Sequence, residues 1–291
     1  MGARFLLAIL WLLHWLPLVL LAPVGRMVGQ VLFALAGSRR RVVLRNLELC
    51  LPEQTAEYRA ALAREHFAWL GRSIVERGLL WYASPARLKR LIRVDGDVQL
   101  AECSERPVMW LVPHFMALDV AGVSVLLFQK RKVVSMYQEQ SNPQVDAAIR
   151  RGRLRLGNAE IFPRADSAKP LLRAIRRGDA FFNLPDMDFG ERDAAYVPFF
   201  NVPAATLLAP SRLARALNMV VQPVVAEALP GGQGYRVRFL PAWEDFPSAD
   251  ALADTAAMNR WIESEIRSNP AQYLWMHKRF KTRPAGGPSL Y

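Results

Sequence analysis

The sequence predicts an α/β fold in which a central mixed, largely parallel sheet is flanked by helices and preceded by an N-terminal membrane helix. A long apolar run near the start of the chain predicts the membrane helix. From about residue 92, short apolar runs alternate with helical windows, which is typical of parallel strands joined by right-handed crossovers. The 291 residues are enough for one such domain with an appendage.

The N-terminal run, residues 5–24, contains no Asp, Glu, Lys or Arg and has about the length that crosses a membrane. His14 and Pro17 weaken it as a straight span, and the next apolar stretch, 27–36, is too short to cross. No small-residue cleavage site follows, so we expect a retained anchor rather than a signal peptide. A single span, a monotopic anchor in one leaflet and a buried helix of a soluble protein all remain open.

Arginines follow the apolar run and predict its orientation. Arg39, Arg40, Arg41 and Arg45 outnumber the single Arg4 that precedes the run, so the positive-inside rule places the main domain in the cytoplasm. We expect a membrane anchor over residues 1–38, a basic helical connector that packs on the core over 39–90, and a catalytic α/β domain over 91–291.

The elements can be assigned in order from the periodicity of apolar residues. Residues 55–82 have a helical period with many aromatic positions, which is more often core than a lipid contact. The alternation in 235–239 lies in an expected strand, 235–240, and indicates one wetter face, which is typical of a strand at a sheet edge. The further expected strands are 108–112, 132–137, 159–162, 180–184 and 220–226, and the expected helices are 117–128, 143–156, 167–177, 204–217 and 250–268.

Composition and missing motifs restrict the classes of function. The net charge of +12 indicates anionic partners, such as acidic lipid, an acidic carrier protein or nucleic acid. No nucleic-acid reader motif is present and the apolar anchor favours a membrane, so we expect no nucleic-acid partner. The chain has no GxGxxG or Walker A loop and no zinc-ligand spacing, so no cofactor and no metal are expected. Two cysteines without a framework indicate a reducing compartment.

The clearest candidate for chemistry follows the strand expected at 108–112. Pro113 ends the strand, His114 follows at once, and Asp119 comes five residues later. If His114 lies in the loop and Asp119 in the first turns of the next helix, the carboxylate can reach back to the imidazole. A carboxylate in that position orients a histidine and stabilises its protonated form, which is the arrangement of a general base. His114 is the only one of four histidines at the end of a buried strand.

These residues and several further blocks resemble a known family. His114 to Asp119 resembles the H-x4-D/E signature of glycerolipid-type acyltransferases, and the rest of the chain is similar, in order, to the bacterial lipid A late acyltransferases. Two departures stand out: many relatives have glutamate where this chain has Asp119, and glycine where it has Asn201. The blocks that carry the resemblance are Asn46-Leu47 with Leu51-Pro52-Glu53, Asn142-Pro143 with 150–155, 185–190 with 197–200 and 204–206, and 275–284.

The resemblance implies a glycerolipid-acyltransferase-like fold and a reaction. Family members transfer a fatty acyl group from acyl-carrier protein to a hydroxyl of an acylated, Kdo-bearing glucosamine disaccharide, at the cytoplasmic face of the inner membrane. We then expect His114 to take the hydroxyl proton, Asp119 to hold the ring, and backbone N–H groups after His114 to bind the oxyanion. No covalent enzyme intermediate is needed, because a thioester is already activated.

The expected acceptor is an anionic lipid, which needs cations. Arg153, Arg155 and Arg164 are the candidates for its phosphates or sugar acids. Asp186 and Asp188, which lie at a strand end, are expected in the same substrate-binding site as partners of these arginines. The structural alternative for Arg155 is an ion pair with Asp186 or Asp188. His277, which lies among cations, is expected to be structural.

Two other classes of function stay open. One is an acyltransferase for another membrane glycolipid or phospholipid that uses the same pair of residues. The other is a non-catalytic membrane lipid-binding protein of the same fold, against which the intact His114–Asp119 pair argues.

Overall fold

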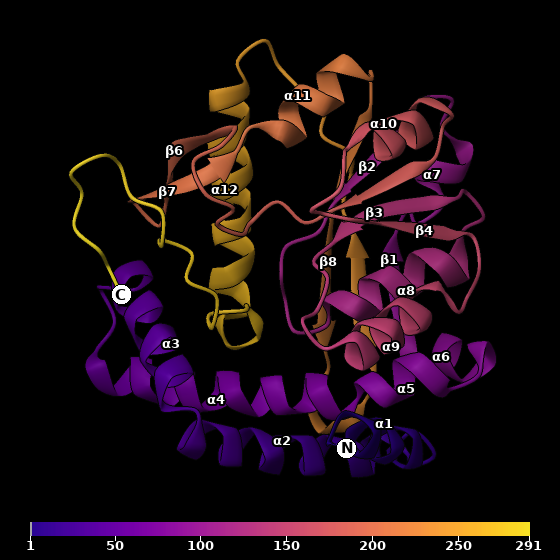
Figure 1. The fold of residues 1–291 in the computed structure, drawn as a ribbon, viewed down its shortest axis with the longest axis vertical. Helices are drawn as coiled ribbons and strands as arrows, with labels where there is room; N and C mark the ends of the chain where they lie inside the picture. The colour runs from indigo at the N-terminus through magenta and orange to yellow at the C-terminus, as the bar shows by residue number, and fades with distance from the viewer. Residues whose placement is uncertain (1) are drawn as a thin grey trace.

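The structure, a computed structural model, describes residues 2–291 and is built around a seven-stranded sheet (Figure 1). The strand order is β1-β9-β8-β2-β5-β3-β4. Neighbouring strands are parallel except that β9 runs antiparallel to β8. The predicted mixed, largely parallel sheet is therefore confirmed. Its strands are β1 (Ile92–Gly96), β2 (Val108–Leu111), β3 (Val133–Tyr137), β4 (Ala159–Pro163), β5 (Ala180–Asn183), β8 (Val220–Ala228) and β9 (Tyr235–Phe239).

Helices cover the sheet and extend below it (Figure 1). The long helix α4 passes under the body, with α2 alongside it. The helices are α1 (Gly2–Leu13), α2 (Leu18–Leu35), α3 (Gly37–Cys50), α4 (Ala56–Val75), α5 (Arg77–Tyr82), α6 (Pro85–Leu91), α7 (Leu100–Cys103), α8 (Leu118–Phe128), α9 (Pro143–Leu154), α10 (Lys169–Arg176), α11 (Ala209–Ala216) and α12 (Ala251–Ser268).

The strand over 235–239 was expected at an edge, and this is wrong. β9 lies between β1 and β8. Its alternation is real: Tyr235, Val237 and Phe239 are buried, while the two arginines between them are partly exposed. Arg236 and Arg238 reach carboxylates of neighbouring elements, so a polar face is tolerated inside the sheet.

The helix expected over 204–217 is also wrong in its first part. Residues Val202–Leu207 form strand β7, which pairs with β6 (Ala194–Phe199) as an antiparallel hairpin, and α11 starts only after it. The hairpin closes at Phe200 and Asn201, both with positive φ (51° and 62°). Two consecutive residues with positive φ make the tight turn that matches the twist of paired strands.

The N-terminal apolar run does not form one helix. It breaks at residues 14–17, and α2 then continues through Pro23 to Leu35, which joins two stretches that the sequence suggested were separate. Pro17 precedes α2, where its fixed φ and missing N–H end the first helix. By length and composition alone, α2 could cross a membrane.

The N-terminal helices share a hydrophobic core with the seven-stranded sheet. Leu10 of α1 and Leu18 and Leu21 of α2 belong to the same buried cluster as Trp110 of β2 and Val112. A second cluster fills the other side of the sheet around Met109 and Leu111 and includes buried residues of α12. The central strand β2, buried along its whole length, thus fixes the position of the loop that follows it.

Candidate active site

His114 lies in the loop between β2 and α8, and the C-terminal segment holds this loop from the other side. The Leu274 N–H donates to the His114 carbonyl oxygen (2.9 Å), and the Met116 N–H donates to the Gln272 carbonyl oxygen (2.7 Å). The Gln272 side chain is itself fixed by both backbone groups of Ala228 on β8. The loop is therefore clamped between two segments that are far apart in the sequence.

The imidazole of His114 is oriented by Asp186. Its Nδ1 lies 2.7 Å from Asp186 Oδ1, and the His114 backbone N–H donates to Asp186 Oδ2 at 2.9 Å. Asp186 follows β5, the parallel neighbour of β2, so both residues lie at the same edge of the sheet. Burial raises the pKa of Asp186, but the charge and hydrogen bonds of His114 outweigh burial and leave the pKa below its usual range. An ionised Asp186 fixes the proton on Nδ1 and leaves Nε2 as the acceptor.

Asp119 does not form the expected hydrogen bond with His114, which is a correction to the sequence interpretation. Its carboxylate instead pairs with Arg77 of α5 (2.8 Å) and Arg153 of α9 (3.1 Å). Burial would raise the pKa of Asp119, but the two guanidinium groups outweigh it and lower the pKa to about 2. Arg77 was missed because it falls in the window 55–82, which the sequence indicated to be core.

The three arginines expected to bind the acceptor have different surroundings. Arg153 lines the pocket that contains His114. Arg155 donates to the carbonyl oxygens of Leu80 and Ala83, so it holds the end of α5. Arg164 stacks on the ring of Phe189, with its guanidinium carbon 3.3 Å from the ring centre.

Asp188 also differs from expectation. Its carboxylate accepts from the N–H and hydroxyl of Thr282, both at 2.7 Å, and its backbone N–H donates to Nε2 of His277 at 3.0 Å. Burial lowers the pKa of His277 to about 4, which suits an uncharged acceptor. Within residues 2–291 neither Asp186 nor Asp188 forms an ion pair with an arginine, so that expectation is wrong. The same residues contain no cluster of three or more potential metal ligands.

The pocket beside His114 has a volume of about 320 Å³. Its polar wall consists of His114, Asp119, Arg77 and Arg153, and α1 contributes an apolar wall with Leu6, Leu7 and Leu10. An apolar slot shares Asp119 and Arg153 with this pocket and runs between α8, α9 and strands β3 and β4. Other side chains that line the slot include Trp81, Val123, Leu126, Val133 and Phe182.

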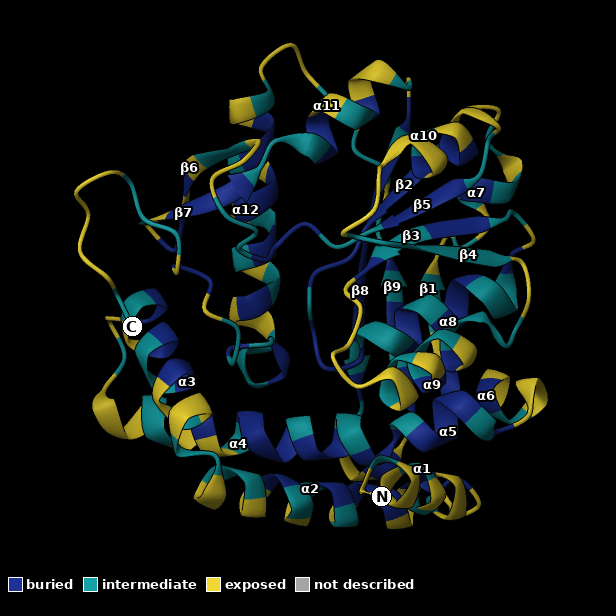
Figure 2. Ribbon diagram, viewed as in Figure 1, coloured by how far each residue is buried: buried dark blue, intermediate teal, exposed yellow. Residues whose placement is uncertain are grey.

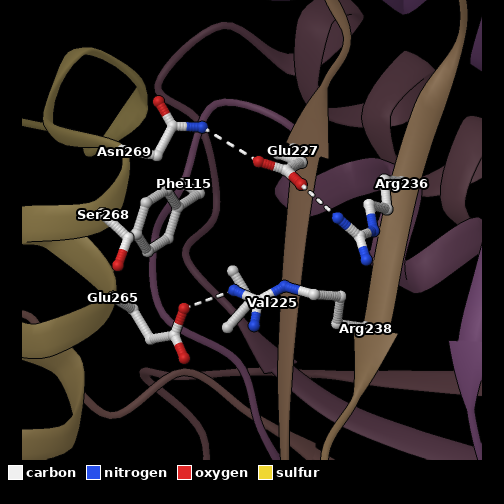
Figure 3. Close-up of a pocket in the computed structure, with 8 residues that line it drawn as sticks. All are labelled: Phe115, Val225, Glu227, Arg236, Arg238, Glu265, Ser268 and Asn269. Atoms are coloured by element: carbon white, nitrogen blue, oxygen red, sulfur yellow. Dashed lines mark hydrogen bonds and ion pairs between the residues drawn. The ribbon is translucent and has the colours of Figure 1, made fainter.

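Another pocket, of about 350 Å³, lies between α12 and strands β8 and β9 (Figure 3). Its charged side chains are already paired with one another, Arg238 with Glu265 and Arg236 with Glu227, and the amide of Asn269 also donates to Glu227. It shares only Phe115 with the His114 pocket. Because the charges of this pocket are compensated internally and it excludes His114, we place the candidate site in the pocket beside His114.

Comparison with known proteins identifies the family. The sequence profile of the bacterial lipid A biosynthesis acyltransferases matches residues 2–282. The chain is 33% identical to the lipid A biosynthesis palmitoleoyltransferase of Escherichia coli K12 over 99% of this chain and 93% of that protein. It is 32% identical to the lauroyltransferase of the same organism, over 98% of this chain and 93% of the relative.

Among solved structures, the 1-acyl-sn-glycerophosphate acyltransferase PlsC of Thermotoga maritima aligns with a TM-score of 0.38 and 12% identity. The alignment covers 79% of this chain and 95% of that protein. The family assignment rests instead on the profile match and the sequence relatives, which extend over almost the whole chain. The chain therefore belongs to the bacterial lipid A biosynthesis acyltransferase family.

Proposed function

We propose that this acyltransferase moves a fatty acyl group from acyl-carrier protein to a hydroxyl of a Kdo-bearing lipid A precursor, with His114 as the general base. The observation that carries the proposal is the His114–Asp186 pair, which lies in a pocket that adjoins an apolar slot. The pair supplies a base and the slot supplies a place for an acyl chain.

The reaction needs one proton carrier and no covalent enzyme intermediate. The acceptor oxygen attacks the thioester carbonyl carbon while its proton passes to Nε2 of His114. Asp186, hydrogen-bonded to Nδ1, stabilises the resulting imidazolium. When the tetrahedral intermediate collapses, the C–S bond breaks and the carrier's thiolate takes the proton from His114. General-base catalysis of this kind typically contributes ~100- to 10,000-fold to the rate.

Backbone donors near His114 support the stabilisation of the oxyanion. The Leu118 N–H is occupied by the Phe115 carbonyl oxygen, and the Met116 N–H by that of Gln272. The Ala117 and Asp119 N–H groups have no protein acceptor within residues 2–291. Ala117 is the N-cap of α8 and Asp119 lies in its first turn, where the helix dipole adds to the attraction of their N–H groups for negative charge.

The remaining partners follow from charge and polarity. Arg153 lies in the His114 pocket and is our candidate for an anionic group of the acceptor, with Arg77 beside it. The net charge of +12 favours docking of an acidic acyl carrier. The apolar α1 wall supports delivery of the acceptor from the inner membrane. The arginines after α2 suit the anionic cytoplasmic leaflet and so support a catalytic domain on the cytoplasmic side.

Mass spectrometry of lipid A from cells with and without this gene tests the proposal directly. We expect one acyl group to be lost with the gene and restored by the wild-type chain but not by His114→Ala. The purified enzyme should then use an acyl group carried by acyl-carrier protein in preference to the same acyl group on coenzyme A. Unchanged lipid A together with altered phospholipid would indicate a different membrane acceptor, and activity of His114→Ala above a tenth of the wild type would exclude His114 as the base.

A further inference from the structure

The outer faces of α1 and α2 form a continuous apolar surface. All large hydrophobic side chains that are exposed in residues 2–291, apart from Tyr58, Tyr196 and Leu252, lie between residues 5 and 35. Figure 2 shows exposed positions along the outer side of both helices and buried ones toward α4. We call this set the apolar platform: Phe5, Leu6, Trp11, Leu12, Trp15, Leu16, Val19, Leu20, Met27, Val31 and Leu35.

We propose that the apolar platform inserts into one leaflet of the membrane, with α1 and α2 lying in its plane and neither helix crossing the bilayer. A patch of this extent on a soluble surface marks an interaction site. The inference does not depend on the acyl donor or acceptor, because it concerns only how the chain meets the lipid.

The first argument is that α2 packs directly against α4. A Cβ atom at Gly29 would lie 2.0 Å from the Phe67 carbonyl oxygen, and one at Gly71 would lie 2.1 Å from the Gly25 carbonyl oxygen. The two helix backbones are therefore in contact where these glycines meet. Arg26 of α2 adds two hydrogen bonds to Glu65 of α4, at 2.7 and 2.8 Å. The helix cannot stand apart from the domain without breaking all of these contacts.

The second argument is that a crossing α2 would carry α4 into the hydrocarbon. α4 contains four charged residues near its start and middle, Glu57, Arg59, Arg64 and Glu65. On insertion scales, each charged side chain at the centre of the bilayer costs ~2.5–3.5 kcal/mol. At ~1.5 Å per residue, the 18 residues of α2 would also barely span a core about 30 Å thick. An orientation in the plane of the leaflet avoids both costs.

The third argument is that α1 belongs to the catalytic body. Leu6, Leu7 and Leu10 line the His114 pocket, and a Cβ at Gly78 of α5 would lie 2.2 Å from the Leu10 carbonyl oxygen. α1 thus presents one face to the pocket and the other to the exterior. If α1 left the domain to cross the membrane, the pocket would lose a wall.

Charge at the ends of the platform matches a lipid surface rather than a second protein copy. Exposed Arg39 and Arg41 follow Leu35 at one end. At the other end, exposed Arg90 lies on α6, whose Arg87 donates to the carbonyl oxygens of His14 and Leu16 between α1 and α2. An apolar strip with cations at its ends fits the acyl chains and anionic headgroups of one leaflet, and repels an identical surface.

Binding to vesicles of phosphatidylethanolamine and phosphatidylglycerol tests the surface with the full-length protein. Leu12→Lys and Val31→Lys each remove one exposed apolar side chain, and we expect each to lower the partition coefficient about 10- to 100-fold. Leu252→Lys is the matched control, because Leu252 is equally exposed (50%, against 52% for Val31) but lies on α12; its binding should not change. If the platform variants instead turn a dimer into a monomer and leave vesicle binding intact, a second copy covers the surface and the proposal is wrong.

Cysteine labelling tests whether α1 and α2 lie in the plane of one leaflet or cross the bilayer. Its result does not depend on how tightly the protein binds the membrane. In a Cys103→Ser background, with Cys50 buried, Arg4→Cys places a single exposed thiol in the first turn of α1, and Ser38→Cys places one just after α2. In sealed inner-membrane vesicles we expect both to react with a membrane-impermeant maleimide from the side to which the catalytic domain is exposed. Reaction of the two thiols from opposite sides would show that the segment crosses the bilayer and would overturn the proposal.

Discussion

At the scale of single residues, two carboxylates beside His114 have separate tasks. Asp186 is fully buried, and both of its carboxylate oxygens contact His114: Oδ1 pairs with Nδ1 of the ring, and Oδ2 accepts a hydrogen bond from the backbone N–H. Asp119 instead forms ion pairs with Arg77 and Arg153. The first arrangement fixes the tautomer and position of the proposed base, whereas the second holds two cations in the pocket where we propose that an anionic acceptor binds.

This division predicts that Asp186→Asn damages the chemical step. The amide keeps the shape of the side chain but cannot stabilise the imidazolium, and it can impose the wrong tautomer on His114. We expect kcat to fall roughly 100- to 10,000-fold, with little change in the acceptor KM. Steady-state kinetics measure this split. Asp188→Asn is the comparison variant: it should weaken the contact with Thr282, and so stability, while retaining most of kcat in the folded fraction. Equal kcat losses in both variants would refute a distinct role for Asp186.

The surroundings of Arg153 and Arg155 predict that replacing the first affects acceptor binding, whereas replacing the second affects stability. Arg153→Ala should raise the acceptor KM roughly 10- to 100-fold, since a charge-assisted contact to phosphate is worth ~1.5–3 kcal/mol. Arg155→Ala should leave that KM unchanged and lower the free energy of unfolding, because it leaves the carbonyl oxygens of Leu80 and Ala83 without their donor. Kinetics and denaturant unfolding of both variants check this. A raised KM for Arg155→Ala alone would reverse the assignment.

At the scale of elements, the free space in the apolar slot between α8 and α9 depends on the absence of a side chain at Gly122. A Cβ atom at Gly122 would have no neighbour within 4 Å, although the residue lines the slot. Gly152, on the facing helix, is the opposite case, because a Cβ there would lie 2.2 Å from the Trp81 ring. Gly122 therefore leaves space for a ligand, whereas Gly152 allows close packing.

We predict that Gly122→Leu shifts the preference toward shorter acyl chains. Each methylene that no longer fits loses about 0.8 kcal/mol, or roughly a fourfold change in kcat/KM. A series of acyl carriers of increasing chain length measures the shift, and retained activity with the shortest donor shows that the variant is folded. Gly152→Ala should instead destabilise the protein without changing the order of preference. An unchanged chain-length profile for Gly122→Leu would mean that the acyl group lies elsewhere.

Some elements follow from sequence and others depend on distant partners. The strand before Pro113 and the position of His114 were predicted, because a buried apolar run and a proline are local signals. The partner of His114 was not, since Asp186 is 72 residues away and is brought close by the pairing of β2 with β5. Local spacing favoured Asp119 instead. The β6–β7 hairpin was missed for a similar reason: its turn residues, Phe200 and Asn201, lack the glycine that usually marks such a turn.

At the scale of the whole molecule, buried groups connect the N-terminal helices with the catalytic loop. His66 of α4 is completely buried beside the segment 271–273, which clamps the His114 loop. Asn46 of α3 donates to the carbonyl oxygens of Trp275 and His277. These contacts join the segments assigned to the connector and the catalytic domain. The division at residues 38 and 90 stays a prediction.

The buried His66 predicts that the whole fold loses stability in mild acid. Burial lowers its pKa to about 4, against about 6.5 in the unfolded chain. Between these values the unfolded state binds more protons, so the free energy of unfolding rises with pH through this window and is fully present above about pH 6.5. From pH 7 to pH 5, His66 alone should cost about 2 kcal/mol. Denaturant unfolding in mild detergent at both pH values measures this, and His66→Leu should reduce the pH dependence by that amount. The same pH dependence in wild type and His66→Leu would show that the acid sensitivity comes from other groups.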